Sequence, residues 1–189
     1  MAKEKKIIFV TGNRSKFEEA SAILGEVGVE LVQKNMEFKE TRTLSQEEVV
    51  REKARLAYAR LKRPVLADDT GIYFEAYSNF PGTFTRYVFS SLGFDGIKRL
   101  LKGKSRRAFF QTMVCLMDGK GCMVFSGKWR GRIISDGKRI SNPDWPYNDI
   151  FVPDGFTLPL AKIPNDIRFK KSHRRKALAK LARYLRCKK

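Results

Sequence analysis

The stretch IIFVTGNRSKFEEASAIL, residues 7–24, decides how the fold begins. Its apolar run at 7–10 ends at a Thr-Gly-Asn turn, and apolar residues then recur with the spacing of a helix face. This order predicts a buried strand, a short turn and a helix. Such a turn collects free backbone N–H groups at the positive end of the helix dipole, so it can bind an anion. Gly12 permits close backbone approach and Lys16 adds a cation, but the turn lacks the GxxxxGK[ST] phosphate-binding pattern, so an ordinary loop stays open as the alternative.

The rest of the chain continues with alternating strand and helix patterns. Because a hairpin pattern interrupts an otherwise βαβ-like order, we expect antiparallel strands within an α/β fold. The expected elements are strands at 29–34 and 64–71, a helix at 45–62 opened by a capping box of Ser45 and Glu48, a short helix at 93–102, hairpin strands at 106–118 and 122–134, turn-rich loops at 135–165 with a short strand at 150–152, and a helix that starts at Ser172.

Length and composition favour one folded domain over residues 1–189. The chain is 42% hydrophobic and 12% aromatic, which is too rich for disorder. It holds no apolar run near the roughly 18 residues of a membrane span and no signal peptide, so we expect a soluble, cytoplasmic protein without membrane contact. Its three cysteines show no paired pattern, and a single histidine makes a structural zinc site improbable, so we expect reduced thiols.

The charge balance is strongly basic. The chain has 39 lysines and arginines against 20 acids, a formal net charge of +19. Such an excess favours anionic partners such as nucleotides, nucleic acid or phospholipid surfaces, but a solvated, cation-rich surface accounts for it equally well. Residues 162–189 carry 12 of the cations and one acid, Asp166, so we place any electrostatic footprint there.

Two adjacent acids follow an apolar run in the segment LADDTG. We expect Asp68 and Asp69 at the end of a strand, where open sheets place their ligand clefts. The two carboxylates would repel each other unless they share a cation, which favours a divalent metal; a turn with one capping and one solvated Asp is the alternative. Lys53 lies on the inward side of the 45–62 helix, where it either snorkels outward or reaches into a cleft, and spacing alone favours snorkelling.

The segment SHRRKAL places cations against a helix dipole. His173 and Arg174 occupy the first turn of the last predicted helix, the end at which positive charge is disfavoured. An anion or an electron-rich base opposite them would explain this placement. A basic helix face that binds nothing is the alternative.

Five separated segments together resemble the inosine triphosphate pyrophosphatase family. They are TGNRSK, KAR before ADDTG, NFPGTFTRYV, GKWRGRI and SHRRKAL, and they follow the family order nearly from end to end. The resemblance implies hydrolysis of the non-standard purine triphosphates ITP, dITP and XTP to monophosphate and pyrophosphate, with Mg²⁺, as a nucleotide house-cleaning activity. It also implies an elongated α/β fold, with a mixed central sheet flanked by helices and a cleft between two lobes, and a homodimer.

The resemblance also assigns roles to individual residues. For the phosphates, it implies that Thr11, Gly12, Asn13 and Lys16 hold the triphosphate and that Lys53 is a second cation. For the metal, it implies that Asp69 is a ligand and also the proton acceptor, with Asp68 as its partner, and that Glu40, or Glu37 as the fallback, is the second ligand. It also implies that Thr70 contacts the substrate and that His173 and Arg174 reach the base. Lysines and Mg²⁺ suit such a reaction, because phosphoanhydride cleavage needs charge neutralisation more than covalent chemistry.

The chain departs from the family pattern where the base is read. The family has aromatic residues, Gly, Asp and often Pro before a hydrophobic-Phe pair, whereas residues 145–151 read WPYNDIF. Trp145 and Tyr147 keep the aromatic character, but Pro146, Asn148 and Asp149 differ. Asn donates and accepts hydrogen bonds while ionised Asp only accepts, so the preferred base edge can change.

Arg168 is a further departure, because the family has lysine there. Its planar guanidinium can stack on a base or bind it in bidentate fashion, which a lysine cannot do. Hydrolysis is therefore better supported than base specificity. Two alternatives stay open: the same hydrolysis of other nucleotides, and a nucleic-acid-binding protein that uses the basic 162–189 segment with weak or lost catalysis.

Overall fold

The computed structural model describes residues 5–38, 42–78, 80–135 and 146–187, and one mixed sheet is its framework. The strands are β1 (Lys5–Val10), β2 (Val29–Lys34), β3 (Val65–Phe74), β4 (Phe80–Gly82), β5 (Arg107–Asp118), β6 (Gly121–Ile133) and β7 (Phe151–Pro153). The α-helices are α1 (Arg14–Gly25), α2 (Gln46–Leu61), α3 (Thr85–Leu100), α4 (Asn165–Lys171) and α5 (His173–Cys187), and the short 3-10 helices are η1 (Glu75–Tyr77), η2 (Pro146–Asp149) and η3 (Leu160–Lys162).

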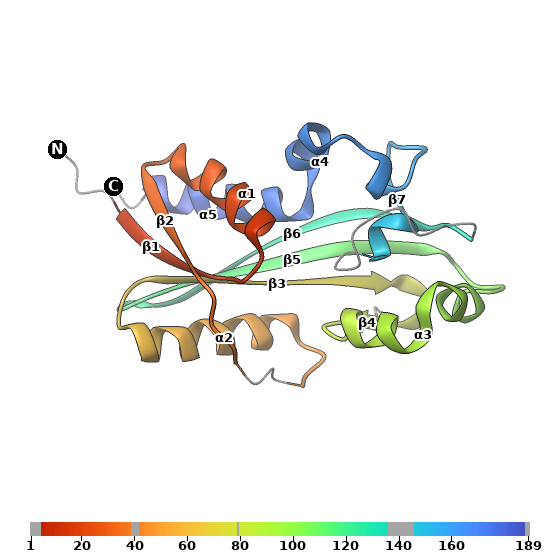
Figure 1. Cartoon of the computed structure of the whole chain (residues 1–189), viewed down its shortest axis with the longest axis horizontal. Coiled ribbons are helices and arrows are strands. Elements are labelled where there is room, and N and C mark those ends of the chain that lie inside the picture. Colours follow the sequence, from red (N-terminus) through yellow and green to blue (C-terminus); the bar gives the residue numbers. More distant parts are fainter. Residues whose placement is uncertain (1–4, 39–41, 79, 136–145, 188–189) are drawn as a thin grey trace.

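The strand order is β2-β1-β3-β5-β6-β7, with β4 paired to β3. Strand β1 runs parallel to β2 and β3, and the pairs β3–β5, β5–β6 and β6–β7 are antiparallel. The expected α/β class with a mixed, elongated central sheet flanked by helices is confirmed (Figure 1).

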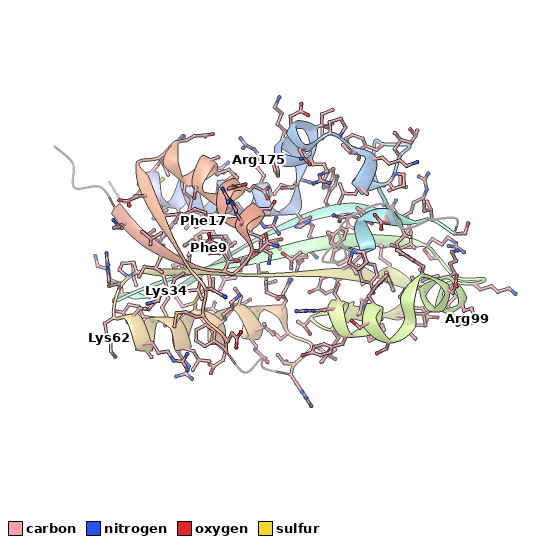
Figure 2. All side chains as sticks on the ribbon, in the orientation of Figure 1. Phe9, Phe17, Lys34, Lys62, Arg99 and Arg175 are labelled. Carbon is pink, nitrogen blue, oxygen red and sulfur yellow. A yellow bond between two sulfur atoms is a disulfide. The ribbon has the colours of Figure 1, made fainter. Side chains whose placement is uncertain are left out.

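Helices cover both faces of the sheet. In Figure 1, α1 and α5 lie on one face, and α2 and α3 lie on the other. Figure 2 shows Phe9 of β1 and Phe17 of α1 in the layer between sheet and helix, where Phe17 packs against the buried cluster that contains Phe9. A second cluster lies under α2, and a third fills the opposite end of the molecule around Phe74, Phe110 and Phe151. The long strands β3, β5 and β6 connect the two ends.

The predicted helix starts are confirmed where a side chain caps the backbone. Asn13 accepts from the Lys16 backbone N–H at 2.9 Å, and α1 begins at the next residue. Ser45 accepts from the Glu48 backbone N–H at 3.2 Å at the start of α2. Each cap satisfies one of the N–H groups that a helix start leaves without a partner.

Four elements differ from the prediction. Strand β3 does not end at the two acids but continues to Phe74, because β5 pairs with it over its whole length. Helix α3 begins at Thr85 rather than at 93, since Gly93 (φ 59°) interrupts the helical backbone and hides the continuity. Strand β4 and helix α4 were not predicted; each is short, and α4 follows Pro164 without a side-chain cap.

The expectation of three reduced cysteines was wrong for two of them. Cys115 on β5 and Cys122 on β6 form a disulfide, with Cα atoms 6.3 Å apart. The tight hairpin between β5 and β6 brings them together, and sequence spacing alone does not show this register. Cys187 is free and exposed. Within the residues that the structure describes, no helix is both long and apolar enough to span a membrane.

Candidate functional site

A cleft made of two adjoining cavities, about 560 and 870 Å³, lies beside β3. The first is lined by the β1–α1 turn, the start of α3 and η2, and the second by the β1–α1 turn, the segment after β2 and α2. The cavities meet at residues that line both of them: Arg42, Val49, Asp69, Arg86, Tyr87 and Ser90.

The turn after β1 places Asn13 and Lys16 on the first cavity and Gly12 on the second. Thr11 is buried, and its hydroxyl accepts from the Asn13 backbone N–H at 3.2 Å, which shapes the turn. A Cβ at Gly12 would lie 2.8 Å from the Asn35 side-chain oxygen, so a larger residue would displace Asn35 from the cavity wall. The turn therefore presents one amide and one ammonium group to the cleft.

Asp68 and Asp69 point to opposite faces of β3. Successive side chains of a strand alternate, so the two carboxylates face apart. The Lys16 ammonium group lowers the pKa of both of them. Asp68 is fully enclosed, its Oδ2 lies 3.0 Å from Lys16 Nζ, and Arg174 Nε lies at 3.7 Å. Lys53 donates to the Asp68 backbone carbonyl at 3.3 Å, which confirms its inward direction.

The cations around Asp68 determine its protonation. Burial alone would raise the Asp68 pKa, but Lys16, Arg174 and Lys53 outweigh it and lower the pKa to about 2. Burial lowers the Lys16 pKa, and the Asp68 charge opposes that change. Asp68 is therefore a fixed anion that holds Lys16 at the edge of the cleft.

Asp69 has the opposite character. It lines both cavities, and burial raises its pKa above the ordinary value, with Gln46 and Lys16 opposing the rise. Its Oδ2 is a buried carboxylate oxygen without a hydrogen-bond partner. A carboxyl group of raised pKa with one free oxygen is suited to accept a proton or to bind a hard cation.

Two glutamates are the remaining predicted metal ligands. Glu37 lines the second cavity, while Glu40 lies outside the described residues. No group of three or more acids, histidines or cysteines in the described part of the chain is arranged to hold a metal ion. Mg²⁺ is commonly bound by one or two protein carboxylates and completes its coordination with substrate and water.

Arg174 meets an anion at the start of α5, as one of the two interpretations of SHRRKAL expected. Its Nη1 lies 2.8 Å from Glu19 Oε2, and the Ser172 hydroxyl donates to Glu19 Oε1 at 2.6 Å. The anion is thus a protein carboxylate on α1. Arg174 does not line either cavity; it connects Glu19 to Asp68 behind the cleft wall.

His173 lies behind the same wall. Its ring stacks on Phe110 with centroids 5.2 Å apart, and its Nδ1 shares a hydrogen bond of 2.6 Å with the Thr112 hydroxyl. Thr112 is in turn 2.7 Å from the hydroxyl of Thr70, which lines the first cavity. Burial and the neighbouring Arg174 lower the His173 pKa well below its ordinary value, so the ring is neutral at pH 7.

We call the part of the first cavity that the start of α3 and η2 form (residues 83–90 and 146–148) its far wall; the lining there is aromatic and polar and includes the charged Arg86. Tyr147 and Asn148 of η2 line it, and the Tyr147 ring packs edge-on against Phe89 of α3 with ring centroids 5.3 Å apart. Trp145 lies outside the described residues. Arg168 does not line the cavity; its Nη1 donates to the Leu160 carbonyl at 3.5 Å.

Several residues of the cleft had no role assigned from the sequence. Residues 83–86 line the first cavity; the segment NFPGTFTRYV contains them and was the available signal. No sequence motif pointed to the buried residues Gln46 and Glu19, because a polar residue in a predicted helix is expected to face solvent. Their contacts run to other elements and are visible only in the fold.

Comparisons with known proteins agree on one family. The model of the family described as Ham1 family matches residues 7–184. The chain is 35% identical over 181 residues to a dITP/XTP pyrophosphatase of Methanopyrus kandleri and 34% identical over 182 residues to an inosine triphosphate pyrophosphatase of Yarrowia lipolytica, each covering 95% of both chains. A solved HAM1 protein from Coxiella burnetii has the same fold, with a TM-score of 0.83, 23% identity and coverage of 96% of this chain and 98% of the other.

Proposed function

Because the chain belongs to the Ham1 family, we propose that it hydrolyses non-standard purine nucleoside triphosphates (ITP, dITP and XTP) to the monophosphate and pyrophosphate. Relatives that match nearly its full length are named for pyrophosphatase activity on dITP, XTP or inosine triphosphate. The observation that carries the proposal is Asp69, a carboxyl group of raised pKa with an unpartnered oxygen at the junction of two cavities.

The arrangement around Asp69 suits attack of water on the α-phosphorus. The Asp69 carboxylate accepts a proton from the water, the new P–O bond forms at the α-phosphorus, and the bond from that phosphorus to the bridging oxygen breaks. Pyrophosphate leaves with the electron pair of that bond. Because burial raises the Asp69 pKa, its carboxylate is a stronger base than an ordinary aspartate.

The part of the cleft that the β1–α1 turn, β3 and α2 form, which we call the near wall, supplies positive charge for the phosphates. Lys16 lines the first cavity and Lys53 the second, on either side of Asp69. Both lysines are held in place, Lys16 by the Asp68 carboxylate and Lys53 by the Asp68 carbonyl. Fixed cations stabilise the charge that develops on phosphate oxygens at no reorganisation cost.

The donor atoms also fit a magnesium ion. The unpartnered Oδ2 of Asp69 is a hard oxygen ligand, and Glu37 lines the adjoining cavity. We propose that Asp69 holds Mg²⁺ together with a glutamate, Glu40 or Glu37. When bound, the ion neutralises phosphate charge and polarises the reacting phosphoryl group.

The far wall is proposed to receive the base. Tyr147 offers an aromatic ring, and Asn148 offers both a donor and an acceptor. Because Asn148 differs from the family pattern, a pyrophosphatase with shifted nucleotide preference is the second candidate. Trp145 remains part of the proposed base site. His173 and Arg174 line neither cavity, so in place of the expected contact with the base we propose that they support the cleft wall through Thr112 and Asp68.

A substrate panel tests the proposal. Purified protein with Mg²⁺ is given ITP, dITP, XTP, GTP, ATP and pyrimidine triphosphates, and pyrophosphate and orthophosphate are measured separately. We expect pyrophosphate, with the highest kcat/KM for ITP, dITP or XTP. A maximum at another nucleotide supports the shifted preference, and the absence of both products with every triphosphate rejects the enzyme.

The assembly is proposed on family resemblance alone. We propose one domain over residues 1–189 that forms a homodimer in solution, which light scattering measures. Nucleic-acid binding by residues 162–189 is less favoured, because Lys176 and Lys180 donate to the β6 carbonyls of Lys128 and Ser126, at 2.9 and 2.7 Å. These contacts fasten two basic residues of α5 to β6, which accounts for part of the basic excess.

A further inference from the structure

A row of three paired residues crosses the sheet beneath the start of α5. Thr70 of β3 pairs in register with Thr112 of β5, and Thr112 pairs with Gly127 of β6. A Cβ at Gly127 would collide with the backbone carbonyl oxygen of His173, the first residue of α5. The missing side chain of Gly127 therefore allows the start of α5 to lie directly on the sheet, with His173 next to Thr112.

Two hydrogen bonds lead from the cleft into the protein interior. The hydroxyl oxygens of Thr70 and Thr112 lie 2.7 Å apart, and the Thr112 hydroxyl lies 2.6 Å from His173 Nδ1. Thr70 lines the first cavity, whereas Thr112 is fully buried and His173 is 8% exposed. Because the Thr112 hydroxyl has a single proton, it donates to one of these partners and accepts from the other. The direction of one hydrogen bond therefore fixes the direction of the other.

Two arrangements of the protons satisfy both contacts. The His173 ring is neutral, because burial and the neighbouring Arg174 lower its pKa, and a neutral imidazole carries one N–H. If that proton is on Nδ1, His173 donates to Thr112, Thr112 donates to Thr70, and the Thr70 proton is left for a ligand in the cavity. If it is on Nε2, Thr112 donates to His173, Thr70 donates to Thr112, and Thr70 offers the ligand only lone pairs.

The charge beside Thr70 favours the first arrangement. Thr70 and Asp68 lie on the same face of β3, because side chains two positions apart on a strand do so. Asp68 holds the Lys16 ammonium group at 3.0 Å, and Lys16 lines the same cavity as Thr70. The ligand group that this lysine attracts is anionic, and the oxygens of an ionised phosphate only accept hydrogen bonds. Thr70 can bind such an oxygen only as a donor.

We propose that Thr112 and His173 are positioning residues that fix the Thr70 hydroxyl as a hydrogen-bond donor to a phosphate group of the substrate, with the His173 proton on Nδ1. The inference rests on the proposed function, in which this part of the cleft holds the triphosphate. It gives His173 a role in phosphate binding through two hydroxyl groups. A donor that is oriented before the ligand arrives lowers the cost of binding.

The chain contains a single histidine, so the proton on Nδ1 can be observed without ambiguity. The protein is labelled with ¹⁵N in the imidazole ring and saturated with inorganic tripolyphosphate, and NMR spectra that correlate ring protons with ring nitrogens are recorded. We expect a proton on Nδ1. An Nδ1 without a proton overturns the inference, because Thr70 would then be an acceptor, suited to a sugar hydroxyl instead of a phosphate. Failure of tripolyphosphate to bind the wild-type protein overturns it as well.

Variants of Thr112 test whether its hydroxyl contributes to binding. Thr112→Val removes the hydroxyl at nearly the same volume, so the affinity for tripolyphosphate, measured by calorimetry, is expected to fall by about fivefold. Thr112→Ser keeps a hydroxyl and is the matched control, with an affinity close to that of wild type. Circular dichroism checks the folding of each variant. Equal affinities of folded Thr112→Val and wild type overturn the inference, and if Thr112→Val does not fold, the NMR spectrum of the wild-type protein decides.

A double-mutant cycle separates this role from packing. Thr70→Val removes the proposed donor, so adding Thr112→Val to it should cause no further loss of tripolyphosphate affinity. Additive losses would mean that Thr112 acts on the cleft by a route other than Thr70, which overturns the inference.

These outcomes are distinguishable from failure of the proposed function. The NMR and binding measurements require no turnover, whereas the proposed function is judged by pyrophosphate release. A proton on Nδ1 without product from any triphosphate supports the donor role of Thr70 and rejects the enzyme. Pyrophosphate release by a protein whose Nδ1 carries no proton supports the enzyme and overturns the inference.

Discussion

The two walls of the cleft are built differently. The near wall holds buried charges in fixed contacts, with Asp68 between Lys16 and Arg174, and Arg174 paired to Glu19. The far wall holds Tyr147 and Asn148 among aromatic rings. Every nucleoside triphosphate carries the same phosphates, whereas the base and, in dITP, the sugar differ. We therefore expect substitutions in the near wall to affect all nucleotides alike and those in the far wall to change preference.

The largest effect is expected at the junction of the walls. Asp69→Asn removes the proton acceptor and should lower kcat by roughly 10²–10⁴-fold for every nucleotide. Pyrophosphate release measures this, and the thermal melting curve serves as the control for folding. An unchanged rate would remove Asp69 from the mechanism.

The next effect concerns the buried ion pair of the near wall. Lys16→Met leaves the enclosed Asp68 carboxylate with weaker compensation, so a loss of about 3 kcal/mol in the free energy of unfolding is expected. Urea denaturation measures it. The matched control is Arg107→Ala, which breaks an exposed pair with Asp154 (2.7 Å) and should cost about 1 kcal/mol or less. Equal losses of unfolding free energy in the two variants would show that burial does not make the Lys16–Asp68 pair more important for stability than the exposed pair.

Acid should remove the contribution of Asp68. Its folded-state pKa is about 2, below the ordinary 3.8, so its stabilisation is present above pH 4 and is lost as the pH falls toward 2. The change is ~2 kcal/mol. The difference in unfolding free energy between wild type and Asp68→Asn, followed by urea denaturation at each pH, should shrink across that window. A constant difference would contradict the assigned pairing.

The smallest effect is expected in the far wall. Asn148→Ala should weaken nucleotide binding by about tenfold, because it removes one donor and one acceptor from the proposed base site. Binding of inorganic tripolyphosphate, which has no base, should be unchanged in this variant and weakened by Lys16→Met. Calorimetry of both ligands provides the comparison. Weaker tripolyphosphate binding by Asn148→Ala would contradict the assignment of phosphate binding to the near wall and base binding to the far wall.

Local signals made the fold largely predictable. The turn at residues 11–13, the capping box that begins at Ser45, apolar periodicity and the hairpin pattern predicted most strands and helices. Helix α3 was predicted too short because its start has no side-chain cap and Gly93 breaks the helical backbone. Strand β4 is defined by its pairing with β3, and a segment of three residues is too short to show a strand pattern in the sequence.

The candidate site was predictable in its parts but not in its contacts. Motif resemblance indicated Lys16, Asp68 and Asp69, and the structure brings all three to the cleft or its wall. That Asp68 and Asp69 face apart follows from strand alternation once β3 is known to continue past them. The pairing of Glu19 with Arg174 joins residues 155 positions apart, which no local pattern can reveal.

Oxygen labelling tests the central claim most directly. ITP is hydrolysed with Mg²⁺ in water enriched in ¹⁸O under single-turnover conditions, and the products are analysed by mass spectrometry. Attack of an Asp69-activated water on the α-phosphorus predicts one ¹⁸O atom in the nucleoside monophosphate and none in pyrophosphate. Label in pyrophosphate, or release of labelled orthophosphate, would contradict the account.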